Sequence, residues 1–221
     1  MATIRKYPLV TNEVYHIFNR SIAKYTIFNN DAEFNRMREL FRYYMWENRR
    51  LRFSKWKELK TDTSSQDDLD GLNKLVIIIA YCVMPTHIHL VLQQRKDNGI
   101  SVFMSQISNS YSRYFNVKYK RKGPLWEKEF NNVLVEDNEQ LLHLTRYIHL
   151  NPSTAYLVDN PQEWPASSYG EYLGKVSKKD RICEFESIIN ISPSEYKEFV
   201  EDRVGYQRDL ANIKHLFLES P

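Results

Sequence analysis

The chain has 221 residues, of which 42% are hydrophobic, 31 are Lys or Arg and 28 are Asp or Glu. This length and apolar content suit one domain with an appendage or two small domains, and exclude a disordered chain. The longest apolar run, residues 75–80, is far shorter than the about 20 residues that cross a membrane, and residues 1–6 lack the apolar core of a signal peptide. Two distant cysteines, Cys82 and Cys183, exclude a disulfide framework. We therefore expect a cytoplasmic globular protein without a membrane partner.

The net charge of +3 is unevenly distributed along the chain. Residues 1–60 contain 13 basic and 6 acidic side chains, and residues 101–136 contain 6 and 3. Residues 61–100 contain 3 and 5, and residues 137–221 contain 9 and 14. A basic body with an acidic tail is compatible with a polyanion partner, although ordinary surface charge explains these counts equally well.

The first predicted elements are a strand and a helix. Residues 13–21 alternate and are rich in aromatic and β-branched types, which predicts a strand. Apolar side chains recur at spacings of three and four over residues 31–50, which predicts a helix capped by Asn30 or Asp31. Residues 61–71 are acidic and polar, which predicts a loop.

A hairpin and a second helix are predicted next. Residues 75–83 form a continuous apolar run typical of a central strand, Pro85 marks a turn, and residues 87–93 alternate as a following strand. We expect these two strands to pair antiparallel. Residues 100–119 have a helical pattern, with Ser101 available as the cap.

The last predicted elements complete the fold class. Residues 130–136 indicate a strand, and Asp137 or Asn138 can cap a helix that Pro152 ends. A further helix is expected near residues 194–204. The order of strands and helices predicts an α+β fold in which helices pack on one face of a mainly antiparallel sheet, followed by a C-terminal helical extension.

Two histidines stand at alternate positions of the second hairpin strand. Side chains at i and i+2 of a strand point to the same face, so His87 and His89 project together. Two such imidazoles form half of a metal site. Two histidines on a solvated strand face are the more frequent meaning of this short pattern.

A tyrosine and an asparagine share one face of the last predicted helix of the body. Tyr147 and Asn151 are four residues apart, so a phenol and an amide oxygen can converge. The amide oxygen could complete a metal site with the histidines, while the phenol stays available as a nucleophile. Three tyrosines on another helix are rival nucleophiles: Tyr111, Tyr114 and Tyr119.

Several ordered motifs resemble those of one family. MPTHIHLVLQ, GPLWEKEF and YIHLNP, at residues 84–93, 123–130 and 147–152, resemble the single-tyrosine HUH transposases, in particular the REP-associated tyrosine transposases. YHIFNRSI at residues 15–22 and EWPASSYGEYL at residues 163–173 are also similar to family segments. The resemblance extends over about residues 10–175, so we expect a transposase domain at residues 1–175 and a helical extension at residues 176–221.

The resemblance implies a fold, a site and a reaction. It implies a ferredoxin-like fold, a catalytic Tyr147, and a metal, Mg²⁺ or Mn²⁺, held by His87, His89 and Asn151. The implied substrate is single-stranded DNA with hairpin-forming, REP-like palindromes, cleaved and rejoined through a 5′-phosphotyrosine. The monomeric habit of the REP-associated branch favours a monomer over a homodimer.

Basic and aromatic residues are candidates for the contacts with DNA. Arg20, near the end of the first strand, and a basic loop could bind phosphates. Trp126 is either a stacking surface for unpaired bases or a core residue. The basic-loop candidates are Lys118, Lys120, Arg121 and Lys122.

Two other functions stay open from the sequence. A domesticated protein that binds hairpin DNA without moving it would retain the same motifs. A replication initiator or relaxase of the wider HUH group would share the chemistry, but the tyrosine that follows the histidines and the GPLW and LNP segments favour the transposase type.

Overall fold

The computed structural model describes residues 8–47, 49, 51–60, 73–206 and 208. Four strands form one antiparallel sheet in the order β2-β3-β1-β4. The strands are β1 Val14–Arg20, β2 Val76–Met84, β3 His87–Gln94 and β4 Asn131–Leu134. The helices are η1 Ile22–Lys24, α1 Asp31–Tyr44, α2 Phe53–Lys60, α3 Gly99–Lys118, α4 Asn138–Thr154, η3 Pro161–Glu163, α5 Tyr169–Tyr172, η4 Lys178–Asp180 and α6 Pro193–Glu201.

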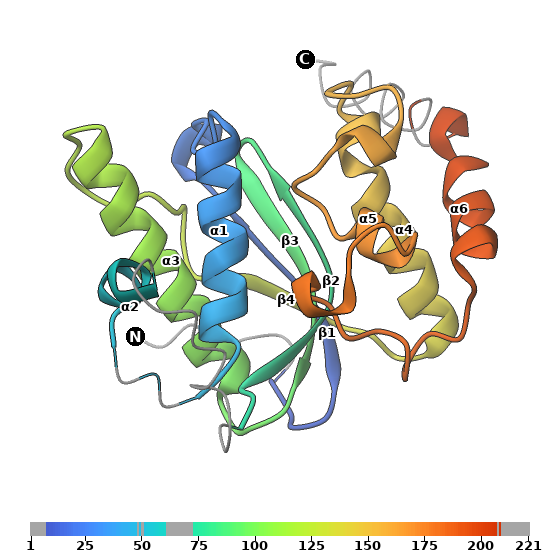
Figure 1. Ribbon diagram of the computed structural model, residues 1–221, viewed down its shortest axis with the longest axis horizontal. Coiled ribbons are helices and arrows are strands. Elements are labelled where there is room, and N and C mark those ends of the chain that lie inside the picture. Colours follow the sequence, from blue (N-terminus) through green and yellow to red (C-terminus); the bar gives the residue numbers. More distant parts are fainter. Residues whose placement is uncertain (1–7, 48, 50, 61–72, 207, 209–221) are drawn as a thin grey trace, which may run out of the picture.

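This arrangement confirms the predicted α+β fold class with an antiparallel sheet. The prediction that helices pack on one face only was wrong, because β2 and β3 bury side chains on both faces and α4 covers the second one. Helices α1 and α3 cover one face, where Tyr81 of β2 contacts Phe41 of α1 and the side chain of Gln94 accepts a hydrogen bond from the first turn of α3. Helix α4 lies over the opposite face, together with α5 and α6, so the sheet separates two helical layers (Figure 1).

The alternation of β3 assigns its residues to these two faces. Ile88 and Leu90 are buried beneath α1 and α3, whereas His87 and His89 point toward α4. The paired register places His89 opposite Phe18 of β1 and Cys82 of β2. The histidine-bearing face is therefore the one that α4 covers.

Most predicted elements are confirmed, and three boundaries were wrong. Helix α1 ends at Tyr44, because Trp46 pairs with Lys74 at the entrance to β2 instead of continuing the helix. Helix α3 is preceded by Asn98, in a left-handed conformation, and not capped by Ser101. Pro152 lies buried inside α4, which continues to Thr154. The predicted caps Asn30 and Asp137 accept the expected backbone hydrogen bonds.

The C-terminal segment is hydrogen-bonded to β2 and to α5. The amides of Ile182 and Cys183 donate to Glu171, and the amide of Glu184 donates to the carbonyl of Ile78 in β2. Helix α6 begins with a capping box between Ser192 and Glu195, which fixes its start. The boundary after residue 175 stays a prediction, and the predicted loop at 61–71 lies outside the described residues.

None of the helices in the described ranges has the length and apolar character that crossing a membrane requires.

Candidate functional site

The histidines of β3 form the centre of the candidate site. Their side chains lie side by side, as the alternation predicts, with ring centroids 5.0 Å apart and planes at 86°. His87 is half-buried, and only 8% of His89 is exposed. The two rings therefore meet under α4, at the end of β3 that follows the β2–β3 turn.

Each of these imidazoles has a partner at Nδ1. His87 Nδ1 lies 2.9 Å from the hydroxyl of Thr86, and His89 Nδ1 lies 3.0 Å from Nε2 of His16 on β1. A hydrogen bond at Nδ1 fixes the ring orientation and the tautomer, and leaves Nε2 as the nitrogen that can bind a metal. Both rings are thus oriented in the way that metal-binding histidines usually are.

Burial keeps all three imidazoles neutral. Burial lowers the pKa of His16 to about 4, and burial together with the charge of Arg20 lowers the pKa of His87 to about 4. Burial and the neighbouring rings lower the pKa of His89 well below its usual value. At neutral pH each ring is therefore uncharged and keeps a lone pair on one of its two nitrogens, which metal binding requires.

Tyr147 lies on α4 directly above the histidines. Its ring stands edge-on to His89, with centroids 5.9 Å apart at 84°, and to His16, at 6.4 Å and 79°. The side chain is nevertheless 42% exposed, so a substrate can reach it. Burial of part of the ring raises the pKa of the Tyr147 phenol, while a hydrogen bond with Asn151 and the charge of Arg20 lower it. The net shift is upward, so the phenol needs activation before it can attack.

Asn151 is joined to the site through Tyr147. Its side-chain nitrogen donates to the carbonyl of Tyr147 at 3.1 Å, one helical turn earlier. The amide oxygen is the atom that could serve as a ligand. Asn151 is half-buried at the end of α4 where Pro152 follows.

The donor set suits a divalent cation. Within residues 8–47, 49, 51–60, 73–206 and 208, no three His, Cys, Asp or Glu side chains are placed to hold a metal ion together. His87 and His89 offer two neutral imidazoles oriented through Nδ1, and the amide oxygen of Asn151, one helical turn after Tyr147, is the candidate oxygen ligand.

The rival tyrosines have other roles in the structure. Tyr111 is fully buried and donates to the carbonyl of Ile27 at 2.6 Å, and burial raises its pKa. Tyr119 donates to Glu33 at 2.6 Å. Tyr114 is half-buried and packs under the guanidinium of Arg36. These contacts belong to the layer of α1 and α3, away from the face that holds the histidines.

The predicted phosphate contacts differ in whether their charge is compensated. Arg20 is exposed and pairs with His87 in the sheet register, so it lies beside the site. Lys118 forms an ion pair with the buried Glu33 at 2.7 Å. Arg121 donates to Asn116 and to the carbonyl of Pro124, which shapes the loop.

The remaining candidates in this loop are two lysines and a tryptophan. Lys120 and Lys122 are exposed. Trp126 is only 9% exposed, its indole nitrogen donates to the carbonyl of Ser108 at 3.2 Å, and its ring packs near Tyr111. Of the two roles considered for Trp126, the structure supports the core role.

Sequence reasoning missed His16 and Thr86. His16 stands in the alternating segment that predicts β1, and it shares the sheet face of His89. The alternation of β1 could have shown that His16 lies on one face of its strand. The sequence pattern did not show that β1 pairs with β3, which brings His16 to His89.

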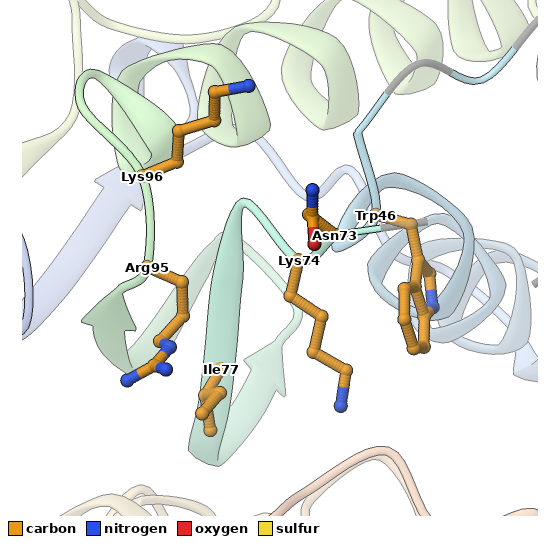
Figure 2. Close-up of a pocket in the computed structure, with 6 residues that line it drawn as sticks. All are labelled: Trp46, Asn73, Lys74, Ile77, Arg95 and Lys96. Carbon is orange, nitrogen blue, oxygen red and sulfur yellow. The ribbon is translucent and has the colours of Figure 1, made fainter. Parts of the chain in front are cut away.

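A basic and aromatic pocket lies at the other end of the hairpin. Figure 2 shows its lining residues, Trp46, Asn73, Lys74, Ile77, Arg95 and Lys96. The pocket has a volume of about 540 Å³. Lys74 is paired with Glu184 and lies over the Trp46 ring, and Lys96 is paired with Glu47. Because these ammonium charges are compensated, the pocket is a weaker candidate for anion binding than the exposed Arg20.

Comparison with known proteins identifies relatives. Residues 45–151 match a family of transposases described as IS200-like, and the match ends at Asn151. A protein of Haemophilus influenzae described as a REP-associated tyrosine transposase is 28% identical over 102 residues, which cover 41% of this chain and 57% of the relative. The matched region thus spans little more than half the length of that relative.

A solved structure resembles the fold. It is described as a REP-associated tyrosine transposase bound to a REP hairpin, and it aligns with a TM-score of 0.53 and 15% identity over 84% of this chain and 93% of that one. At this identity the likeness bears on the fold, which it shares with the sheet and helices described above.

Proposed function

Since residues 45–151 of this chain match the IS200-like transposase family, we propose that the protein is a REP-associated-type DNA transposase that cleaves and rejoins single-stranded DNA at hairpin-forming repeats. Tyr147 is the nucleophile, and His87, His89 and Asn151 hold the metal. The observation that carries the proposal is the position of Tyr147, which stands 5.9 Å from the His89 ring and is still 42% exposed.

The proposed reaction exchanges one phosphodiester for another. The Tyr147 oxygen attacks the scissile phosphorus, the bond from phosphorus to the 3′ oxygen breaks, and a 5′-phosphotyrosine forms. The proton lost by the phenol is taken up by the departing 3′ oxygen, which leaves as a hydroxyl. The reverse step, with the same or another strand, restores a phosphodiester without an external energy source.

A divalent ion bound at this site would neutralise the non-bridging phosphate oxygens and orient the scissile bond. Imidazole ligands favour Mn²⁺ over Mg²⁺. His87 and His89 offer two nitrogens already oriented through Thr86 and His16. Asn151 supplies the oxygen and also holds the helix turn that presents Tyr147.

The substrate contacts follow from exposed positive charge near this site. Arg20, next to His87 in the register, is the first candidate for a phosphate contact, and Lys120 and Lys122 are further candidates in the loop after α3. Lys118 and Arg121 contribute less, because they are bound to Glu33 and to loop carbonyls. The monomeric state stays a prediction.

The experiment that tests the proposal traps the covalent product. Full-length protein with Mn²⁺ is incubated with a labelled single-stranded oligonucleotide that carries a REP-like hairpin, and adducts are separated under denaturing conditions. We expect Tyr147→Phe to abolish the adduct while hairpin binding is retained, because only the phenol oxygen is lost. Tyr156→Phe is the matched control, since Tyr156 follows the same helix and is 58% exposed. An adduct that persists in Tyr147→Phe would refute the assignment.

The same experiment, repeated with an oligonucleotide that lacks the hairpin, separates the alternative functions. If the protein is a domesticated hairpin-binding protein, the wild type and Tyr147→Phe should both bind the oligonucleotide, and neither should form an adduct. An initiator or relaxase would cleave without any dependence on a REP-like hairpin.

A further inference from the structure

His16 contacts His89 through an edge of its ring. Both side chains point to the α4 face of the sheet, and the register pairs His16 with Val91, two residues from His89, so the two rings are diagonal neighbours. The nitrogens are 3.0 Å apart, the centroids are 5.2 Å apart, and the planes differ by 19°. Nearly coplanar rings joined nitrogen to nitrogen form an in-plane hydrogen bond, because the lone pair of an imidazole nitrogen lies in the ring plane.

One proton lies between these two nitrogens. Either His89 donates from Nδ1, or His16 donates from Nε2. If His89 uses the lone pair of Nε2 for a metal, its proton must be on Nδ1, and His16 must then accept at Nε2 and carry its own proton on Nδ1. Thr86 can likewise accept a hydrogen bond from Nδ1 of His87, because its hydroxyl oxygen lies 2.9 Å from that nitrogen.

We propose that His16 is a positioning residue for the metal site, which accepts the Nδ1 proton of His89 and thereby holds His89 with Nε2 unprotonated and directed to the metal. This inference rests on the proposed function. His16 is not itself a third ligand through Nε2, because that nitrogen already meets His89. The ring of His16 also stands edge-on to Tyr147, so one side chain supports both the ligand and the nucleophile.

The first test measures metal affinity in the absence of DNA. Mn²⁺ alone is titrated into the full chain by calorimetry. His16→Leu removes the acceptor, and we expect it to weaken Mn²⁺ binding by about 10–100-fold, as loss of an outer-shell partner does. His16→Gln keeps an acceptor oxygen, and we expect it to recover most of this loss.

A matched control separates the hydrogen bond from packing. Phe18 lies on the same strand and the same face, with its ring 5.1 Å from His16 and 6.0 Å from His89, and it has no polar atom in its side chain. Phe18→Leu should therefore leave the Mn²⁺ affinity close to that of the wild type. Equal losses in Phe18→Leu and His16→Leu would overturn the inference, because the effect would then be one of packing.

The second test reads the tautomer directly. Nitrogen-15 NMR of the metal-free protein should show His89 and His16 both protonated at Nδ1, and His16→Leu should shift His89 toward protonation at Nε2. A His89 tautomer that does not respond to His16→Leu would overturn the inference, as would an unchanged Mn²⁺ affinity.

These outcomes are distinct from failure of the proposed function. An adduct that persists in Tyr147→Phe would refute the nucleophile and leave the tautomer result standing. An adduct that requires Tyr147, with no response of the tautomer or the Mn²⁺ affinity to His16→Leu, would refute the role of His16 alone.

Discussion

Two polar clusters that contain histidines lie on opposite sides of α4 and differ in role. The sheet-face cluster consists of His16, His87 and His89, and the buried cluster consists of His149, Ser168 and Tyr196. On the sheet face, His89 is nearly buried, and among the described residues its side chain has one hydrogen-bond partner, His16, at Nδ1. Beneath the C-terminal segment, His149 is fully buried, and both of its nitrogens are bonded, Nδ1 to Tyr196 and Nε2 to Ser168, each at 2.7 Å. Burial lowers the pKa of both, to about 3 for His149. Burial and a lowered pKa are therefore shared by a candidate ligand and a structural residue, and the number of bonded nitrogens distinguishes them.

The His149 cluster joins three parts of the fold. Ser168, which bonds His149, also accepts from the backbone amide of Tyr81 in β2, while Tyr196 belongs to α6. The ring of Tyr172 stands edge-on to His149 at 4.9 Å. These hydrogen bonds therefore link the C-terminal segment and α4 to the sheet. They also stabilise the position of α4, the helix that carries Tyr147.

The largest expected effect concerns the sheet-face cluster. We expect His89→Ala to weaken Mn²⁺ binding by more than about 100-fold, because a ligand is lost and not only its support. The free energy of unfolding should also fall, because His89 is buried, but by less than in His149→Ala, since within the described ranges only His16 loses a hydrogen bond. Mn²⁺ titration and denaturant unfolding of the same preparations check both parts. Strong Mn²⁺ binding by His89→Ala would remove His89 from the ligand set.

The converse is expected for the buried cluster. His149→Ala should lower the free energy of unfolding by about 3 kcal/mol, because it leaves a cavity and removes two buried hydrogen bonds, those with Tyr196 and Ser168. The folded fraction should bind Mn²⁺ as the wild type does. Urea unfolding monitored by circular dichroism measures the first quantity, and a loss of Mn²⁺ affinity equal to that of His89→Ala would contradict the division between the clusters.

Acid should reveal the buried histidine as a pH-dependent loss of stability. The unfolded chain protonates His149 near pH 6.5, but the folded protein does so only near its lowered pKa of about 3. Stability from the neutral imidazole is therefore complete above pH 6.5 and is lost as the pH falls toward 3, by at most about 1.4 kcal/mol per pH unit. The glutamine of His149→Gln does not titrate. As the pH is lowered from 6.5 to 4, the wild type should therefore lose more stability than the variant, and the unfolding free energy of the variant relative to the wild type should rise. A constant difference over this range would show that His149 does not stay neutral.

The smallest expected effect removes a single hydrogen bond from the buried cluster. Tyr196→Phe keeps the ring and removes the hydroxyl that bonds His149. We expect the free energy of unfolding to fall by about 1 kcal/mol, with no change in Mn²⁺ affinity. Parallel unfolding curves of Tyr196→Phe and the wild type check this, and identical midpoints would mean that the bond contributes nothing net.

Local patterns predicted the elements well where periodicity was strong. The alternation in β1, the apolar run in β2 and the capped starts of α1 and α4 are all confirmed. The end of α1 and the passage of α4 through Pro152 were wrong, because each depends on packing against other segments. Trp46 pairs with Lys74, and Pro152 is buried in the core.

The sequence by itself determined which residues share a face and which family the motifs resemble. A period of two places His87 and His89 together, and a period of 3.6 places Tyr147 above Asn151. These relations lie within one element, so they follow from backbone geometry alone.

Only the tertiary structure decided which polar groups are available for chemistry. His16 meets His89, Glu33 neutralises Lys118, and Ser168 with Tyr196 occupies both nitrogens of His149. Each pairing joins residues far apart in the chain, and its energy depends on burial that no local pattern encodes. Availability for binding is therefore a property of the assembled fold, whereas residue type and spacing are properties of the sequence.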